Sequence, residues 1–309
     1  MPFIPPCMFG DSLNLVKNRI QSKTNDKMTE SQKVAIVTGG NKGLGLAICR
    51  GLAKTFKGHI YLTARNEEQG LKAVHELEQE GLTVQFHQLD IDDLASIKRL
   101  KEFLEQNHGR IDVLVNNAGI RFKSSSTEPY EIQAHQSVQT NYFGVKNTCL
   151  ELFPLLASGA RVVNVSSGAG FLSNIPGENL KARFQSPTLT LEQLDELMNE
   201  YVQAANAGDH TQHGWPDAKG PYIVSKVGLS ALTRIQQRLN STPDVAINHV
   251  HPGYVKTDMN PKGTVTTDEG AKSALMAALL PPGTDLKGQF IWSTCQVVDW
   301  LTGPDPDLK

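Results

Sequence analysis

The chain has 309 residues, 39% of them hydrophobic and 20% charged, with a formal net charge of −2. This composition is typical of a globular protein, and a charge so close to zero argues against nucleic acid as the main partner. No apolar run approaches the ~20 residues of a transmembrane helix and no charged leader precedes an apolar one, so we expect neither a membrane partner nor secretion.

Cysteine and histidine usage predicts no metal site. The four cysteines lie far apart and form no CxxC pair, which fits reduced thiols in the cytoplasm. His249 and His251 alternate on an expected strand without a third ligand. We interpret His210 and His213 as solvated residues of a polar loop.

The first 31 residues differ from the rest of the chain. Pro2, Pro5 and Pro6 open it and basic residues follow among polar ones, so we expect residues 1–31 to form a flexible N-terminal extension. A basic amphipathic stretch keeps a mitochondrial presequence open as an alternative, and Met28 is a second possible start. Residues 32–309 are then expected to form one domain.

From Lys33 onward, short β-branched runs alternate with helical patterns, which predicts parallel strands joined by crossover helices. We expect an α/β fold with a doubly wound seven-stranded parallel sheet, that is, a Rossmann fold. The expected strands are Val34–Thr38, Ile60–Thr63, Thr83–Leu89, Val113–Val115, Arg161–Val165, Val245–Val250 and Gln289–Trp292. The expected helices are Leu44–Phe56, Glu67–Glu80, Leu94–Gln106, Glu131–Leu156, Pro221–Leu239 and Glu269–Leu280.

Residues 170–220 form an insertion where a connection of only a few residues is usual. Its middle, Leu189–Ala205, has apolar residues at helical spacing. We therefore expect an ordered helix there, with a floppy surface loop as the alternative.

A glycine-rich segment, Thr38-Gly39-Gly40-Asn41-Lys42-Gly43-Leu44-Gly45, joins the first strand to the first helix. Glycines let the backbone turn tightly and approach a pyrophosphate, whose charge is met by the helix N-terminus. A plain strand-to-helix turn is the simpler interpretation, but three glycines in this context predict nucleotide binding.

The residues at the end of the second strand indicate whether such a site binds NAD or NADP. NAD sites place a carboxylate there for the ribose 2′-hydroxyl, whereas this chain has Thr63-Ala64-Arg65. Arg65 and Lys42 together supply two cations for a 2′-phosphate. The sequence therefore favours NADPH, although either cation alone also fits a solvated surface.

Two further segments end strands near this nucleotide site. Asp90 can accept from the adenine amine, whereas Asp92 and Asp93 are expected to charge the N-terminus of the next helix. In Asn116-Asn117-Ala118-Gly119, side-chain amides are expected to tie neighbouring strands while the backbone passes close to a ligand. An ordinary turn is the alternative for this second segment.

Ser166 and Ser167 end the fifth strand, at the edge where α/β proteins bind ligands. We expect Ser167 to hydrogen-bond a substrate carbonyl and Ser166 to be a structural neighbour. Asn141 is a poor helix former in an apolar helix. It either bends that helix through its amide or holds a water that links Lys226 to solvent.

Tyr222 and Lys226 are four residues apart and share one face of an expected helix. A tyrosine hydroxyl ionises near pH ~10, and an ammonium that favours its anion makes it a proton donor at neutral pH. A surface tyrosine and lysine would show the same spacing. The motifs upstream favour the catalytic interpretation.

In this order the motifs resemble the short-chain dehydrogenase/reductase family, and specifically its monomeric NADPH carbonyl reductases. The resemblance spans roughly Lys33 to Leu301 and includes the long insertion before the tyrosine helix. It rests on TGGNKGLGLA at Thr38–Ala47, LTAR at Leu62–Arg65, FHQLDIDD at Phe86–Asp93, DVLVNNAGI at Asp112–Ile120, TNYFG at Thr140–Gly144, RVVNVSS at Arg161–Ser167, GWP at Gly214–Pro216, YIVSK at Tyr222–Lys226 and TDM at Thr257–Met259.

The resemblance implies a catalytic tetrad of Asn141, Ser167, Tyr222 and Lys226. It also implies that a segment after Pro252-Gly253 meets the nicotinamide. The expected cofactor-binding residues are Gly39, Asn41, Lys42, Gly43, Leu44, Gly45, Arg65, Asp90, Ile91, Asn117, Ala118, Gly119, Tyr222, Lys226, Val255, Lys256 and Thr257.

Two residues depart from the family pattern. Animal carbonyl reductases have a cysteine before the Pro-Gly pair and a tryptophan after it, both bordering the substrate pocket, whereas this chain has His251 and Tyr254. Broad quinone reduction is still expected, and binding of glutathione-linked substrates is left open.

We therefore expect a cytoplasmic, monomeric enzyme that uses NADPH to reduce quinones, aldehydes and ketones. One alternative is a narrow-specificity steroid, prostaglandin or pterin oxidoreductase on the same fold. The other is an NADPH-binding interaction protein without catalysis, against which the intact tetrad argues.

Overall fold

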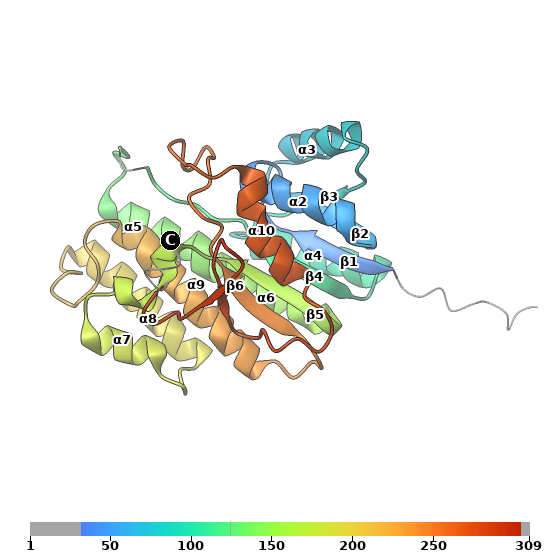
Figure 1. The fold of residues 1–309 in the computed structure, drawn as a ribbon. Coiled ribbons are helices and arrows are strands. Elements are labelled where there is room, and N and C mark those ends of the chain that lie inside the picture. Colours follow the sequence, from blue (N-terminus) through green and yellow to red (C-terminus); the bar gives the residue numbers. More distant parts are fainter. Residues whose placement is uncertain (1–31, 124, 304–309) are drawn as a thin grey trace, which may run out of the picture. The chain divides into compact units, whose positions relative to one another are not determined.

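The computed structural model describes residues 32–123 and 125–303. The expected N-terminal extension, residues 1–31, and the possible start at Met28 lie outside the described residues. The described residues from Lys33 onward belong to one compact unit. Its centre is an eight-stranded sheet with the order β3-β2-β1-β4-β5-β6-β7-β8 (Figure 1). The strands are β1 (Lys33–Val37), β2 (Gly58–Ala64), β3 (Gln85–Gln88), β4 (Ile111–Asn116), β5 (Leu156–Val165), β6 (Ala246–Val250), β7 (Phe290–Ile291) and β8 (Val297–Val298).

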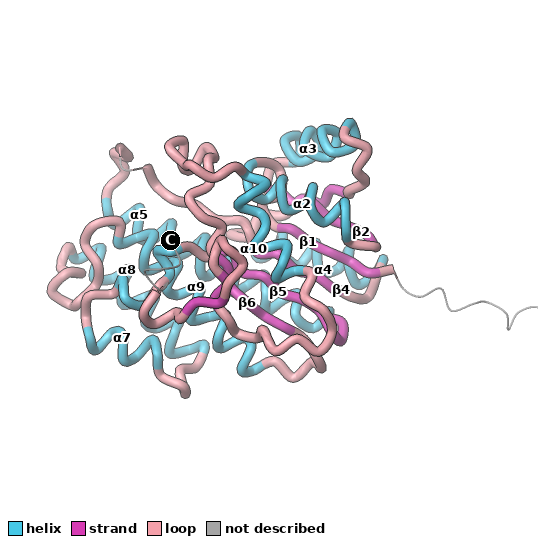
Figure 2. Tube along the Cα trace, viewed as in Figure 1, coloured by secondary structure: helices cyan, strands magenta, loops and turns pink. Residues whose placement is uncertain are grey.

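The first seven strands run parallel, as predicted, and β8 adds an antiparallel edge to β7. The eighth strand escaped the sequence analysis because two residues are too short to show a period. Helices surround the strands in Figure 2. The helices are α2 (Gly43–Thr55), α3 (Glu67–Gln79), α4 (Leu94–Asn107), α5 (Tyr130–Val138), α6 (Val145–Leu152), α7 (Glu178–Gln185), α8 (Leu191–Ala207), α9 (Gly220–Leu239) and α10 (Thr267–Ala278).

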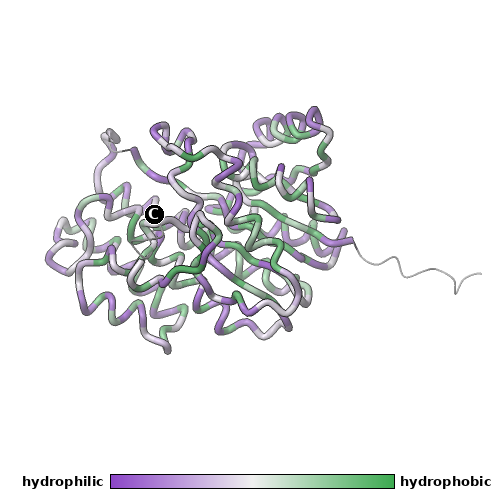
Figure 3. Tube along the Cα trace, viewed as in Figure 1, coloured by the Kyte–Doolittle hydropathy of each residue, from purple (hydrophilic) through white to green (hydrophobic). Residues whose placement is uncertain are grey.

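Two apolar clusters hold the helices to opposite faces of the sheet. Along β1, Val34 and Ile36 belong to the cluster of α4, α5, α6, α8 and α9, whereas Ala35 and Val37 belong to that of α2, α3 and α10. This alternation is the two-residue period of a strand buried on both faces. Figure 3 accordingly shows the central strands as predominantly hydrophobic.

The continuous helix expected over Glu131–Leu156 is wrong. The structure has α5, a π-helical segment over Gln139–Gly144, α6 and a short 3-10 turn before β5 begins at Leu156. Pro154 in that turn stops the helix, and the wider π turn accommodates Asn141, whose amide bonds to other segments.

The insertion contains α7 and α8. Thr190 begins α8 through a capping box with Gln193, and Gly208 ends it in the left-handed conformation (φ 74°). The helix packs against α5 and α9. The helix expected over Leu189–Ala205 is therefore present as α8, and the alternative of a floppy loop is wrong.

Within the described residues, no helix combines the length and apolarity needed to cross a membrane. No group of three histidine, cysteine or acidic side chains in the same part of the chain is arranged to hold a metal ion.

Candidate active site

Helix α9 places Tyr222 and Lys226 one turn apart beside the carboxyl end of β5. Lys226 is only 5% exposed, and its Nζ donates a hydrogen bond of 2.8 Å to the carbonyl oxygen of Val165, the last residue of β5. The same Nζ lies 5.9 Å from the centre of the Tyr222 ring. The predicted pair is therefore brought together in a largely buried setting rather than on the surface.

Burial shifts the acidity of both groups. It lowers the pKa of Lys226 to about 8, because the ammonium loses its water. It also raises the pKa of Tyr222, and a hydrogen bond with Ser167 and the positive charge of Arg121 act against that rise. We had expected Lys226 to lower the pKa of Tyr222, whereas in the structure Ser167 and Arg121 are the groups that act against its rise.

The two serines at the end of β5 face different surroundings. The Ser166 hydroxyl is buried against that of Ser230, at 2.9 Å, in a structural contact. The Ser167 hydroxyl accepts from the backbone nitrogen of Ala169 at 3.2 Å and also reaches Tyr222. Ser167 thus lies beside Tyr222, where one ligand atom can meet both hydroxyls.

Asn141 is fully buried in the π-helical segment and joins two parts of the site. Its Oδ1 accepts from the backbone nitrogen of Ile120 at 2.8 Å, and its Nδ2 donates to the carbonyl of Ile120 at 2.9 Å and to the hydroxyl of Ser225 at 3.0 Å. The amide therefore fixes the loop after β4 against α9. This arrangement fits the expectation of an amide that bends its helix.

The glycine-rich segment and the Asn-Asn-Ala-Gly turn form one tightly packed corner. Asn117 Nδ2 donates to the carbonyls of Thr38 and Gly39 at 2.9 and 3.0 Å, and the Thr38 hydroxyl accepts from the backbone nitrogens of Asn117 and Ala118. A Cβ on Gly45 would lie 2.2 Å from the Gly39 carbonyl oxygen. No side chain fits there, so glycine at this position lets the start of α2 pack tightly against the turn.

Gly119 has a similar constraint next to the catalytic residues. A Cβ at this position would lie 2.9 Å from Asn141 Oδ1 and 3.6 Å from Lys226 Nζ. On the Asn116 side of the turn, Nδ2 donates to Asn164 Oδ1 at 2.8 Å, which ties β4 to β5. The turn therefore links neighbouring strands, as the amides suggested.

The two cations expected at the 2′-phosphate have different surroundings. Arg65 is exposed at the end of β2. Lys42 instead forms an ion pair with Asp258, its Nζ 2.8 Å from Oδ2, and both side chains are largely exposed. Screening makes such a pair weak, so Lys42 is available to a stronger anion. Asn41 donates to Gln69 at 3.1 Å, and Leu44 packs into the core.

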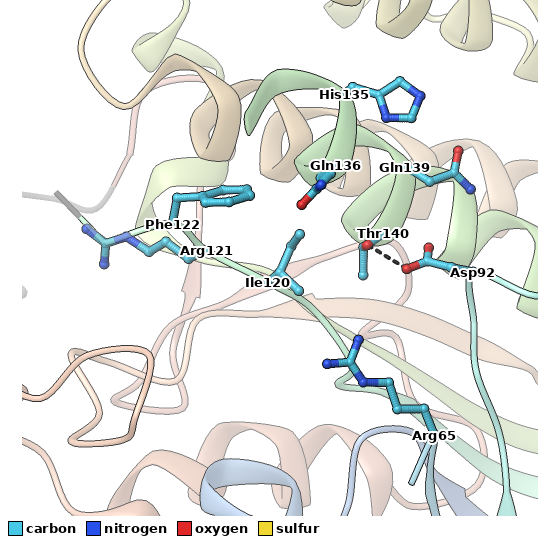
Figure 4. A pocket seen from close by; sticks show the side chains of 9 residues that line it. All are labelled: Arg65, Asp92, Ile120, Arg121, Phe122, His135, Gln136, Gln139 and Thr140. Atoms are coloured by element: carbon cyan, nitrogen blue, oxygen red, sulfur yellow. Dashed lines mark hydrogen bonds between the residues drawn. The ribbon is translucent and has the colours of Figure 1, made fainter. Parts of the chain in front are cut away.

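Arg65 lines a pocket of about 390 Å³ between the end of β2, the loop after β4 and α5 (Figure 4). The Asp92 carboxylate lines the same pocket and accepts from the Thr140 hydroxyl at 2.7 Å. Asp92 was expected to charge the N-terminus of α4, but only Asp93 caps that helix, through the backbone nitrogen of Ala95. Burial raises the pKa of Asp92.

Asp90 lies at the end of β3, where its Oδ1 accepts from the backbone nitrogen of Asp92 at 3.0 Å. Its neighbour Ile91 is buried. On the opposite side, Val255 and Val265 form a short bridge, and a Cβ on Gly43 would lie 3.3 Å from Thr257 Cγ2. The segment after β6 therefore touches the glycine-rich segment.

The two residues that depart from the family pattern take different positions. His251 Nδ1 accepts from the backbone nitrogen of Gly168 at 3.0 Å, and its ring packs 4.0 Å from that of Trp292. Burial lowers the pKa of His251 to about 4, so this imidazole is neutral near pH 7. It supports the turn after Ser167, whereas Tyr254 is 47% exposed.

Arg121 is a residue that the sequence analysis missed. It lies in the loop after β4, with its Cζ 5.4 Å from the centre of the Tyr222 ring. It follows the Asn-Asn-Ala-Gly turn by two residues, and that closeness to a functional turn was the only signal in the sequence.

Comparisons with known proteins agree with this geometry. A family model described as short chain dehydrogenase matches residues 33–179. Carbonyl reductase (NADPH) 1 of Homo sapiens is 45% identical over 281 residues, which are 88% of this chain and 100% of that protein. The solved structure of salutaridine reductase from Papaver somniferum has a TM-score of 0.77 at 32% identity and covers 84% of this chain and 99% of its own. Menthone neomenthol reductase from Mentha piperita has a TM-score of 0.74 at 31% identity, with 85% and 99% covered.

Proposed function

Since the chain belongs to the short-chain dehydrogenase family, we propose that it is an NADPH-dependent carbonyl reductase, which converts quinones, aldehydes and ketones to alcohols. The observation that carries the proposal is the meeting of Ser167, Tyr222 and Lys226 at the carboxyl end of β5. The carbonyl reductases of several mammals, at 43–45% identity, support the same activity and cofactor.

The residues present fit a dinucleotide. Gly39 and Gly43 have positive φ angles of 64° and 56°, and a Cβ on Gly45 would collide with the Gly39 carbonyl, so glycine is required where the segment turns tightly into α2. When bound, NADPH supplies the hydride from its nicotinamide ring. Arg65 and Lys42 are the residues that would hold its 2′-phosphate.

Each member of the tetrad has a distinct role in this proposal. Ser167 orients and polarises the carbonyl, and Tyr222 donates the proton to its oxygen. Lys226 holds the nicotinamide ribose and stabilises the tyrosinate. Asn141 holds the loop that follows β4 in a fixed position against α9. It also supports the proton path behind Lys226.

The remaining cofactor contacts come from the segments that converge on the glycine-rich cradle. Backbone atoms of these segments approach the ligand, while Asp90 accepts from the adenine amine. We assign them to Gly39, Asn41, Gly43, Leu44, Gly45, Asp90, Ile91, Asn117, Ala118, Gly119, Val255, Lys256 and Thr257.

A second candidate is a reductase of narrow substrate range on the same fold. It is supported by the similarity to salutaridine and menthone neomenthol reductases, each named for one compound or compound pair. The test is NADPH oxidation by the purified protein across quinones, aldehydes, ketones, steroids and pterins. Turnover of many unrelated carbonyls supports the broad assignment, turnover of one class supports the narrow one, and turnover of none contradicts both.

The same proposal includes a small-molecule substrate, a cytoplasmic location and a monomeric state. Packing of α8 over α5 and α9 supports the monomer, because these helices would otherwise leave an apolar face uncovered.

A further inference from the structure

Arg121 connects two loops above the proposed proton donor. Its Nη1 donates a hydrogen bond of 2.6 Å to Asn260 Oδ1, in the loop between β6 and α10. Its Cζ lies 5.4 Å from the centre of the Tyr222 ring. The side chain is half-buried and lines the pocket shown in Figure 4 together with Ile120 and Phe122. Asn260 therefore holds a guanidinium close to the ring of the proposed proton donor.

The charge of Arg121 has no carboxylate partner among the described residues, whose ion pairs involve other cations. The acid in the facing loop, Asp258, pairs with Lys42. Arg121 donates to the neutral amide oxygen of Asn260, which orients the guanidinium without cancelling its charge. Most of its five N–H donors are left for another group.

A half-buried guanidinium without a counter-charge is costly, because burial removes water that stabilises the cation. An incoming carboxylate offsets that cost, and its two oxygens match the planar fork of donors. We expect the cofactor phosphates at the glycine-rich segment and at Arg65, which lines the same pocket as Arg121. The guanidinium of Arg121 lies instead over the ring of Tyr222, the proposed proton donor.

We propose that Arg121 is an anion-recognition residue, which makes this protein select carbonyl substrates that also carry a carboxylate. The inference rests on the proposed carbonyl reductase function. Asn260 holds the guanidinium in place, while Ile120 and Phe122 supply apolar surface for the uncharged body of the substrate.

The experiment compares 4-carboxybenzaldehyde with its methyl ester, since the two share the reacting aldehyde and differ in the charge. We measure the ratio of kcat/KM for the acid to kcat/KM for the ester. Hydrogen bonds to a charged group are strong, so Arg121→Gln should lower this ratio by roughly 10- to 100-fold, mainly through KM of the acid. Asn260→Asp, which places a competing carboxylate on the guanidinium, should lower the ratio in the same direction.

Lys123→Gln is the matched control, because it removes an exposed positive charge from the same loop and should leave the ratio unchanged. An equal loss for acid and ester in Arg121→Gln would overturn the proposal, as would an equal weakening by Lys123→Gln. A matching rise in the NADPH dissociation constant would assign Arg121 to the cofactor and also overturn it. If the wild-type protein reduces neither the ester nor an uncharged quinone, the carbonyl reductase assignment itself fails. If the glutamine variant does not fold, Arg121→Lys takes its place. Because this variant retains the positive charge, it should keep part of the preference for the acid over the ester.

Discussion

At the scale of single residues, burial and the neighbouring side chains act on the pKa of Tyr222 in opposite directions. Burial raises its pKa and keeps its proton on, while Ser167 and Arg121 make the anion more accessible. We expect Tyr222→Phe to bind NADPH normally but to lose about 10²- to 10⁴-fold in kcat, because only the proton donor is removed.

Steady-state kinetics and NADPH fluorescence titration of the same variant test this. Tyr61→Phe is the control, since it loses a hydroxyl that bonds, among the described residues, to the His108 ring at 2.7 Å. A Tyr222→Phe enzyme with near-normal kcat would point to another proton donor.

Lys226 sets a second expectation, about pH. Its pKa is lowered to about 8, so its ammonium is present below that pH and is lost as the pH rises through it. In the proposed function, the ammonium stabilises the tyrosinate that forms when Tyr222 donates its proton. We therefore expect kcat/KM for carbonyl reduction to fall as the pH rises through about 8. A profile measured from about pH 6 to 10 reports this group in the free enzyme.

The affinity for NADPH over the same pH range separates the two roles of the lysine. If kcat falls while the dissociation constant stays level, the charge acts on proton transfer. A flat kcat/KM profile up to about pH 10 would contradict the lowered pKa.

At the scale of elements, we propose that the end of β2 and the start of α2 set the choice of cofactor. Arg65 and Lys42 occupy these two positions, so Lys42→Ala with Arg65→Asp should shift preference from NADPH toward NADH. The ratio of kcat/KM for the two cofactors measures the shift. An unchanged ratio would show that neither side chain meets the 2′-phosphate. Asp258→Asn is a useful control, since it frees Lys42 and should leave or strengthen the NADPH preference.

The helices and strands that surround the site were largely predictable, because their residues repeat with regular periods. The π-helical segment was not, because its cause is the hydrogen bonding of Asn141 to Ile120 and Ser225, both distant in sequence. The Lys42–Asp258 ion pair spans 216 residues and has the same origin. Contacts of this kind depend on tertiary structure, and no local sequence pattern predicts them.

In the candidate site, too, some residues could be predicted from the sequence and others could not. Ser167, Tyr222 and the glycine-rich segment follow strand ends or helix starts, so the parallel-sheet prediction already placed them at one edge. Arg121 and Asn260 lie in irregular loops with no periodic signal, and only their meeting above Tyr222 reveals a role. Asp92 was misplaced for a related reason, since an acid before a helix resembles a cap until its partner Thr140 is seen.

At the scale of the whole molecule, the insertion bears on the assembly state. Met198 of α8 is fully buried against α9, where a Cβ on Gly228 would lie 2.6 Å from its Sδ. Asp195 of the same helix accepts from the Tyr142 hydroxyl at 2.8 Å and pairs with Lys146 at 2.5 Å. Helix α8 therefore covers, within one chain, a face that could otherwise pair with another subunit.

We expect light scattering of the purified protein to give a mass near the 33.8 kDa of a single chain. Met198→Lys should lower the melting temperature and promote association that grows with concentration, because a charge buried under α8 loosens it and exposes apolar surface. Asn199→Lys, at the exposed neighbouring position, is the matched control and should stay monomeric with a nearly unchanged melting temperature. A stable wild-type tetramer at micromolar concentration would contradict the monomer. A wild-type dimer would do so as well, while leaving open whether the face covered by α8 is the one that pairs.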